Sequence, residues 1–421
     1  MPNGAATAHL YEPKLAAVLR EGYSLDTLRR DAVAGLTVAI VALPLSMAIA
    51  VASGVSPDHG LYTAIVGGFV VSALGGSRYQ IGGPAGAFIT LVAATVADIG
   101  LDGLALAVLV SGALLTAVGL MGLGRFIRLI PHAVTVGFTG GIAVTIAASQ
   151  IKDLFGLTVS HEPGPFLPKL AALAAAMPTV SPAAMTLGAG CAALIFGIRR
   201  LAPHWPGMLI AVVAASVAAL ALGLPVDTIG LRFGGIPHGL PAPHMPAFSL
   251  ALLGTVLPAA LSFTLLGGVE SLLSAKVADG MTGRAHRSNM ELVAQGLANV
   301  ASALFGGIAV TGTIARTATN VRAGARTPVA GLLHSAFLLV FMLVAGSLAS
   351  YVPLSALAGV LIVVCWNMAE KREFAALLRQ PAPAAVLLAT FGLTIVKDLT
   401  FGIVGGCGLA FVLWLLERRK A

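Results

Sequence analysis

The stretch AVAGLTVAIVALPLSMAIAVAS, residues 32–53, contains no charged side chain and is long enough to cross the hydrocarbon core of a membrane as one α-helix. Comparable apolar runs recur along the whole chain. Of its 421 residues 57% are hydrophobic and only 10% are charged, and the mean hydropathy is +0.95. Because about a quarter of the residues in a soluble domain are charged, this composition predicts an all-α polytopic membrane protein.

Glycine, proline and charged residues divide the rest of the chain into about fourteen membrane segments, seven in each half. The predicted domains are a cytoplasmic N-terminal segment over 1–30 with a short interfacial helix at 11–21, a first repeat over 31–223, an extended proline-rich linker over 224–249, and a second repeat over 250–418.

The basic residues are unequally distributed when a chain with a cytoplasmic N-terminus is threaded through these segments. Eighteen of the 25 Lys and Arg residues fall in cytoplasmic positions and four fall outside. Loops that stay in the cytoplasm carry such an excess. We therefore expect a protein of the bacterial inner (plasma) membrane with both termini cytoplasmic, and we attribute the net charge of +8 to these loops, not to nucleic-acid binding.

Two of the predicted segments, 85–98 and 312–321, are too short to cross a membrane alone. Each is the third of its half, and each follows a loose stretch, 79–84 or 306–312. Because the first half holds an odd number of spans, the second half runs inverted. Paired short segments in inverted halves indicate a transporter whose site lies at the membrane midplane. Coincidence in a chain rich in Gly and Ala is the other explanation.

A helix that begins at membrane depth points its unpaired N–H groups and its positive dipole end at whatever lies there. Two such helices facing each other form an anion site without any charged side chain. Close helix packing would also explain the small side chains at these positions. The predicted substrate-binding residues are Ala85, Gly86, Ala87, Gly312, Thr313, Ile314 and Ala315.

Arg316 lies inside the second short segment, in TGTIARTATN. A guanidinium at that depth is costly unless it is paired or hydrated, so it indicates function. We expect it to add a fixed positive charge to the anion cavity, with a structural pair to a carboxylate such as Glu270 as the alternative.

Glu270 stands in the long eighth segment with no charged residue among the twenty before it. A carboxyl group in apolar surroundings can bind and release a proton near neutral pH. Gly267 and Ser274 share its helix face and offer space and one hydroxyl. We expect Glu270 and Ser274 to form the coupling-ion site, for a proton more than for sodium; a fixed salt bridge is the alternative.

No motif of an enzyme or a metal site occurs in the sequence. HExxH, GxSxG and P-loop patterns are absent, and Cys191, Cys365 and Cys407 are far apart without metal-site spacing. We expect no enzymatic activity, no metal and no cofactor, and therefore no ATP-driven transport by this chain itself.

Three stretches, in order, resemble the sulfate permease (SulP) family of anion transporters. They are SPDHGLYTAIVGG (56–68), FGGIPHGLPAPHMP (233–246) and the long block GGVESLLSAKVADGMTGRAHRSNMELVAQGLANVASALFGGIAVTGTIARTATNVRAGARTPVAG (267–331). The resemblance runs from about Asp31 to Glu417.

This resemblance implies a seven-plus-seven inverted repeat divided into a mobile core, made of spans one to four and eight to eleven, and a gate made of the others. It places the substrate between Ala85–Ala87 and Thr313–Arg316, and associates Glu270 with proton or sodium coupling. It also implies homodimers and an elevator-like movement of core past gate.

The sequence departs from the family in two respects. Many members carry a polar residue directly after the proline of the first span, whereas here Leu45 follows Pro44. We include Leu45 in the predicted substrate site. Members usually continue into a C-terminal STAS domain, and no such domain follows within the 421 residues.

These observations predict a secondary active transporter of small anions, of the sulfate, bicarbonate or dicarboxylate class, coupled to protons. A passive anion channel or an anion exchanger on the same fold is the main alternative. A nucleobase carrier and a non-transporting binding protein are weaker alternatives.

Overall fold

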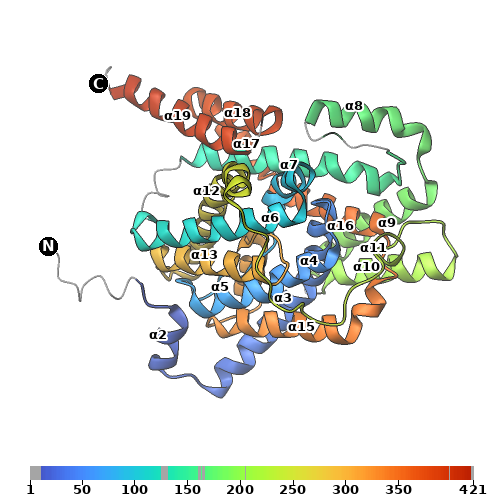
Figure 1. Ribbon diagram of the computed structural model, residues 1–421, viewed down its shortest axis with the longest axis horizontal. Coiled ribbons are helices and arrows are strands. Elements are labelled where there is room, and N and C mark those ends of the chain that lie inside the picture. The colour runs from blue at the N-terminus through green and yellow to red at the C-terminus, as the bar shows by residue number, and fades with distance from the viewer. Residues whose placement is uncertain are drawn as a thin grey trace. The chain divides into compact units, whose positions relative to one another are not determined.

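The computed structural model shows a chain that is helical almost throughout (Figure 1), and it describes residues 11–124, 131–159, 163, 166–203, 205–397 and 399–418. Residues 1–10 of the predicted N-terminal segment therefore lie outside the described residues. Within the described ranges, eight helices are long and apolar enough to cross a membrane, and three shorter apolar helices accompany them. The predicted class of a helical, multi-span membrane protein is confirmed, while the number of fourteen segments stays a prediction.

The described elements fall into two compact units. The first unit contains α2 (Lys14–Glu21), α3 (Leu25–Ala52), α4 (Pro57–Tyr62), the π-helix η2 (Thr63–Gly67), α5 (Gly68–Leu74), β1 (Gly82–Gly83), the 3₁₀ turn η3 (Gly86–Phe88), α6 (Ile89–Leu120), α11 (Ile229–Phe233), α12 (Leu250–Thr282), α13 (Ser288–Leu304), β2 (Thr311–Gly312), α14 (Ile314–Arg322) and α15 (Val329–Ala349).

The second unit contains α7 (His132–Phe155), α8 (Phe166–Ala176), the 3₁₀ turn η5 (Met177–Thr179), α9 (Pro182–Leu201), most of α10 (Gly207–Ala221), α16 (Leu354–Met368), α17 (Lys371–Leu377), α18 (Pro381–Val396) and α19 (Leu399–Arg418). Met208–Ile210 of α10 group with the first unit. The two units follow the predicted core and gate, because the first holds spans one to four and eight to eleven.

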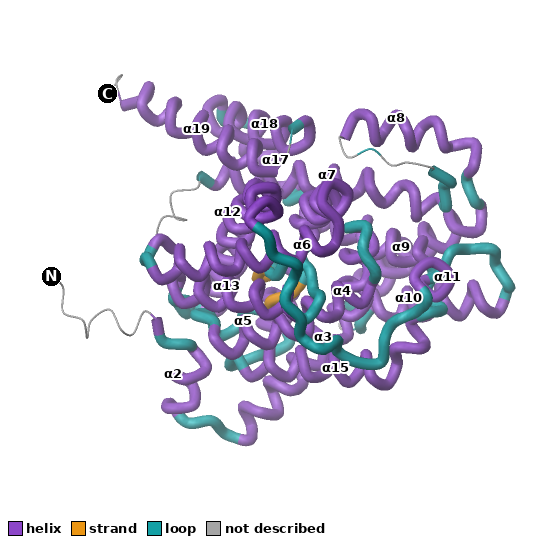
Figure 2. The backbone as a smooth tube through the Cα atoms, in the orientation of Figure 1, coloured by secondary structure: helices purple, strands orange, loops and turns teal. Residues whose placement is uncertain are grey.

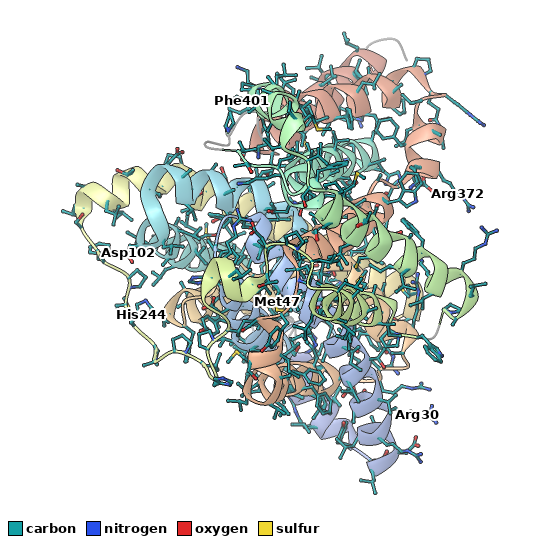
Figure 3. The ribbon with its side chains drawn as sticks, turned by 90° about the vertical axis from the view of Figure 1, so that its right-hand side faces the viewer. Arg30, Met47, Asp102, His244, Arg372 and Phe401 are labelled. Atoms are coloured by element: carbon teal, nitrogen blue, oxygen red, sulfur yellow. The ribbon has the colours of Figure 1, made fainter. Side chains whose placement is uncertain are left out.

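Helix α3 begins earlier than the predicted first segment. The Ser24 hydroxyl accepts the N–H of Thr27 at 3.2 Å and so caps the helix, which then starts at Leu25. Figure 3 shows Met47 of this helix among its neighbours and Arg30 near its outer end. The helix packs along α15, as Figure 1 shows. A Cβ added at Gly35 would lie 2.5 Å from the Ala330 carbonyl oxygen, so a glycine is needed for this close approach.

The third and fourth predicted segments form one long helix, α6, with a break. Gly100 has φ 72°, in the left-handed region that favours glycine, and it separates the two parts. The second part packs closely on α13, because a Cβ at Gly112 would lie 2.6 Å from the Gly296 carbonyl oxygen.

A two-stranded antiparallel pair joins the starts of the two short segments. β1 pairs with β2 in the register Gly82↔Gly312 and Gly83↔Thr311, and both strands lie among the helices of the first unit (Figure 2). Thr313 N–H also donates to the Ile81 carbonyl at 3.0 Å. Two segments about 230 residues apart are thereby held side by side, with η3 leaving one strand and α14 leaving the other.

Candidate functional site

Arg316 lies in the first turn of α14, directly after strand β2. Its side chain is a buried cation with a relative exposure of 1%. Its Nη2 donates to the Ser46 hydroxyl at 3.1 Å and to the Pro84 carbonyl at 3.4 Å. Its Nε and Nη1 have no acceptor among the described residues. The same ranges contain no carboxylate paired with it, so the predicted alternative of an ion pair with Glu270 is not present.

The backbone of β1 makes room for this guanidinium. A Cβ at Gly83 would lie 2.1 Å from Nη1 of Arg316, a distance that no real Cβ adopts. The Arg316 side chain therefore extends from α14 past Gly83 of β1 to α3, where its guanidinium donates a hydrogen bond to Ser46.

Ser46 is the polar residue of the first span that contacts the predicted site. It is fully buried, and its hydroxyl donates to the Ala42 carbonyl at 2.7 Å while accepting from Arg316. Leu45 is buried as well, at 5% exposure. Ser46 was not among the residues predicted from the sequence, although a hydroxyl two residues after the mid-helix proline Pro44 was a usable signal.

Helix α12 fixes the strand pair through serine hydroxyls. Ser271 accepts the N–H of Gly312 at 3.2 Å and lies 2.8 Å from the hydroxyl of Thr311. Ser274 donates to the Thr317 hydroxyl at 3.1 Å, and that hydroxyl accepts the N–H of Ile81. Ser271 was missed in the sequence analysis, and Ser274, predicted beside the coupling ion, is bonded to Thr317.

The predicted backbone donors divide into two groups. The N–H groups of Gly312 and Thr313 are used within the protein, by Ser271 and by Ile81. In contrast, the N–H groups of Ile314 and Ala315 in the first turn of α14 have no acceptor in the described part of the chain, as is usual for a helix start. The same holds for Ala85, Gly86 and Ala87 before and within η3. These five N–H groups and the guanidinium of Arg316 are thus hydrogen-bond donors that lack a full set of acceptors among the described residues.

Glu270 lies on the face of α12 that points toward these elements. One turn before it, a Cβ at Gly267 would lie 3.5 Å from the ring of Phe88, and one turn after it Ser274 contacts Thr317. Its side chain is half-buried, and its Oε2 has no hydrogen-bond donor among the described residues. A buried carboxylate oxygen without a hydrogen-bond donor is energetically costly.

Gln80 is a further polar side chain that the sequence analysis missed. It is 4% exposed, and both ends of its amide lack a partner within the described ranges. A Cβ at Gly312 would lie 1.7 Å from its Nε2, so the amide lies directly on the β2 backbone. Its only signal in the sequence was a polar residue within the loose stretch before the third segment.

Comparisons with known proteins identify the family of this chain. The sequence model of the sulfate permease family matches residues 28–390. YvdB of Bacillus subtilis, named as a candidate sulfate transporter, is 42% identical over 404 residues, which cover 95% of this chain and 76% of that protein. The bicarbonate transporter BicA of Picosynechococcus is 31% identical over 93% of this chain and 71% of its own length.

Solved structures show the same fold. The transmembrane domain of a cyanobacterial bicarbonate transporter BicA superimposes with a TM-score of 0.82 at 30% identity, covering 90% of this chain and 98% of that one. SLC26A9 superimposes with a TM-score of 0.87 at 19% identity, over 98% of this chain and 69% of that one. On the family match over residues 28–390 and the identity to these transporters, the chain belongs to the sulfate permease family.

Proposed function

We propose that this chain is a secondary active transporter that takes up a small anion together with a proton. Family membership supports anion transport, since relatives are named as transporters of sulfate or bicarbonate. The finer assignment is ours: Arg316 and the N–H groups at the starts of η3 and α14 bind the anion, and Glu270 carries the proton. The substrate belongs to the class of sulfate, bicarbonate or a small dicarboxylate.

The proposed anion site rests mainly on one observation, the guanidinium of Arg316 that lacks a charged partner. A buried charge without a partner is expensive, and several kcal/mol per ion is a typical order of magnitude. Its Nε and Nη1 lack acceptors while Nη2 is held by Ser46 and Pro84. An anion would supply both the missing acceptor and the missing charge, and the free N–H groups would add further donors.

In this proposal the carboxyl of Glu270 binds the proton that is transported with the anion. It lies on the same α12 face as Ser274, which is bonded into the strand-pair network, and its Oε2 lacks a donor in the part of the chain that the structure describes. Loading a proton would neutralise this carboxyl before it is enclosed. Sodium is less suited, because it needs several oxygen ligands and the Ser274 hydroxyl is already bonded to Thr317.

Transport by this scheme requires the site to face each side of the membrane in turn. All the anion-site and coupling residues belong to the first unit. We therefore propose that this unit moves as one body in an elevator-like manner, in a homodimer of the bacterial inner membrane with both termini in the cytoplasm.

The test is uptake of radiolabelled anions into proteoliposomes, with sulfate, bicarbonate and a C4-dicarboxylate compared with and without an inward proton gradient. Accumulation of one anion that depends on the gradient would support symport and would name the substrate. Anion-for-anion exchange, or an anion current, that is indifferent to the proton gradient would instead support the exchanger or channel alternative.

A further inference from the structure

Helix α2 is attached to two loops of the first unit by polar contacts. The N–H of Lys14 donates to the Gly75 carbonyl at 2.9 Å, and Arg287 Nη1 donates to the Glu12 carbonyl at 2.6 Å. At the other end of the helix, Arg78 Nη2 donates to the carboxylate of Glu21 at 2.5 Å. The helix therefore lies against the loop before β1 and the loop between α12 and α13.

A cavity of about 180 Å³ lies between these three segments. Its charged lining residues are Lys14 of α2, Arg78 of the loop before β1, and Asp279, Arg284 and His286 from the end of α12 and the loop that follows it. None of these residues belongs to the anion and coupling site proposed above. The cavity is large enough for several water molecules or one polyatomic anion.

The acidic groups beside this cavity are already engaged. His286 Nδ1 lies 2.6 Å from Asp279 Oδ2, which also accepts the His286 backbone N–H at 3.1 Å. The carboxylate of Glu21 is held by Arg78. Over the described residues, the ammonium of Lys14 and the guanidinium of Arg284 have neither a hydrogen bond nor an ion pair.

The surroundings leave a surplus of positive charge. Glu12 is shared between Arg20 and Arg287, so one carboxylate serves two cations. Burial, followed by repulsion from Arg287 and Arg78, lowers the pKa of the Lys14 ammonium from its ordinary value, although Glu21 and Asp279 partly offset this. Residues 1–10 contain no Asp or Glu that could compensate.

We propose that this cavity binds a phosphate group, held by Lys14 and Arg284 with Arg78 at its edge. Basic side chains from three separate segments line one small volume, and a tetrahedral dianion or diester offers several acceptor oxygens on one centre. Cations and phosphate oxygens form short, charge-assisted hydrogen bonds. Binding would join α2 to both loops and so hold the helix in its docked position.

The phosphate can come from two sources. The predicted topology places these loops on the cytoplasmic side, where clusters of Lys and Arg near the membrane attract anionic lipid headgroups. Leu19 on α2 and Leu25 at the start of α3 are exposed apolar side chains, which suit a membrane surface. A free phosphate or phosphate ester would offer the same oxygens.

The experiment measures thermal unfolding of the purified full chain and of the double variant Lys14→Gln/Arg284→Gln. One arm titrates inorganic phosphate at constant ionic strength, and the other adds phosphatidylglycerol against phosphatidylcholine in mixed micelles. Arg29→Gln is the matched control, because it removes one exposed basic residue outside the cavity. Lys14→Arg keeps the charge.

We expect the wild type, Arg29→Gln and Lys14→Arg to be stabilised, and the double variant to need at least about tenfold more ligand for the same shift. A response to phosphatidylglycerol alone would identify the headgroup as the source, and a response to inorganic phosphate would show that a free group suffices. Equal shifts in the double variant and the wild type would overturn the proposal, as would a wild type that responds to neither ligand. Phosphate that bound only at the transport site would shift the wild type and the double variant equally, and it would therefore also overturn the proposal.

Discussion

The guanidinium of Arg316 and the hydroxyl of Ser46 lie 3.1 Å apart, although 270 residues separate them in the sequence. The hydroxyl accepts from Nη2 and leaves Nη1 and Nε without an acceptor among the described residues. Ser46 therefore orients the arginine without neutralising it.

Ser46→Ala should raise the KM for the transported anion severalfold, corresponding to about 1 kcal/mol for one lost hydrogen bond. The guanidinium would lose the acceptor that fixes its direction. Initial rates of uptake over a range of anion concentrations measure the change. Ser53→Ala is the matched control, since Ser53 is equally buried and also donates to a carbonyl four residues earlier at 2.7 Å, without touching Arg316. Equal effects of the two variants would argue against a positioning role for Ser46.

Arg316→Gln should abolish anion binding and leave the melting temperature unchanged or raised. Removing one partner of a buried ion pair is strongly destabilising, whereas Arg316 has no carboxylate partner in the described ranges, so its loss strands no opposite charge. Thermal unfolding with and without the anion measures both properties. The control is Arg322→Gln, an exposed residue on the same helix. A large drop in stability without the anion would mean that Arg316 is structural.

Gly83→Ala should impair anion binding as severely as a change to Arg316 itself. The added Cβ would lie 2.1 Å from Nη1 and would displace the guanidinium or the strand. Gly280→Ala serves as the comparison, because nothing lies within 4 Å of a Cβ at that helical position. There the change should be neutral or should stabilise the protein by up to about 1 kcal/mol. Isothermal titration with the anion would reveal normal affinity in the Gly83 variant if the close approach were unimportant.

Asp31→Asn should destabilise the first unit by about 2–4 kcal/mol without a specific effect on anion affinity. Its buried carboxylate accepts the N–H groups of Arg326 at 2.7 Å and Thr327 at 3.1 Å, as well as the hydroxyls of Thr327 and Tyr23. An amide offers one acceptor oxygen in place of two. Asp26→Asn, on the exposed turn of the same helix, should change the melting temperature little. A melting temperature for Asp31→Asn equal to that of Asp26→Asn would contradict this prediction.

The membrane class and the two short segments were predictable because they depend on local patterns. Composition and apolar run length identify a spanning helix whatever it packs against, and the tenth segment, predicted at 312–321, is observed as α14 at Ile314–Arg322. The resemblance of 267–331 to a known family supplied the division into core and gate, which no local pattern contains.

The contacts inside the site were not predictable from one sequence. The strand pair at Gly82 and Gly312 requires partners from opposite halves, and two-residue strands have no periodicity to detect. Gln80 and Ser271 belong to polar networks whose members are distant in sequence. Helix α8 was missed because an eleven-residue helix containing Pro168 and Lys169 is too short and interrupted to be identified as a span.

The most direct test of proton-coupled uptake compares wild type with Glu270→Gln in proteoliposomes, with the Glu291→Gln variant as a control for a buried carboxyl that is held by Ser77 and Gln295. An inward proton gradient should drive anion accumulation by the wild type. The Glu270→Gln protein should lose accumulation but still bind the anion or exchange it. Undiminished, gradient-driven accumulation by Glu270→Gln would contradict the assignment of the proton to this residue.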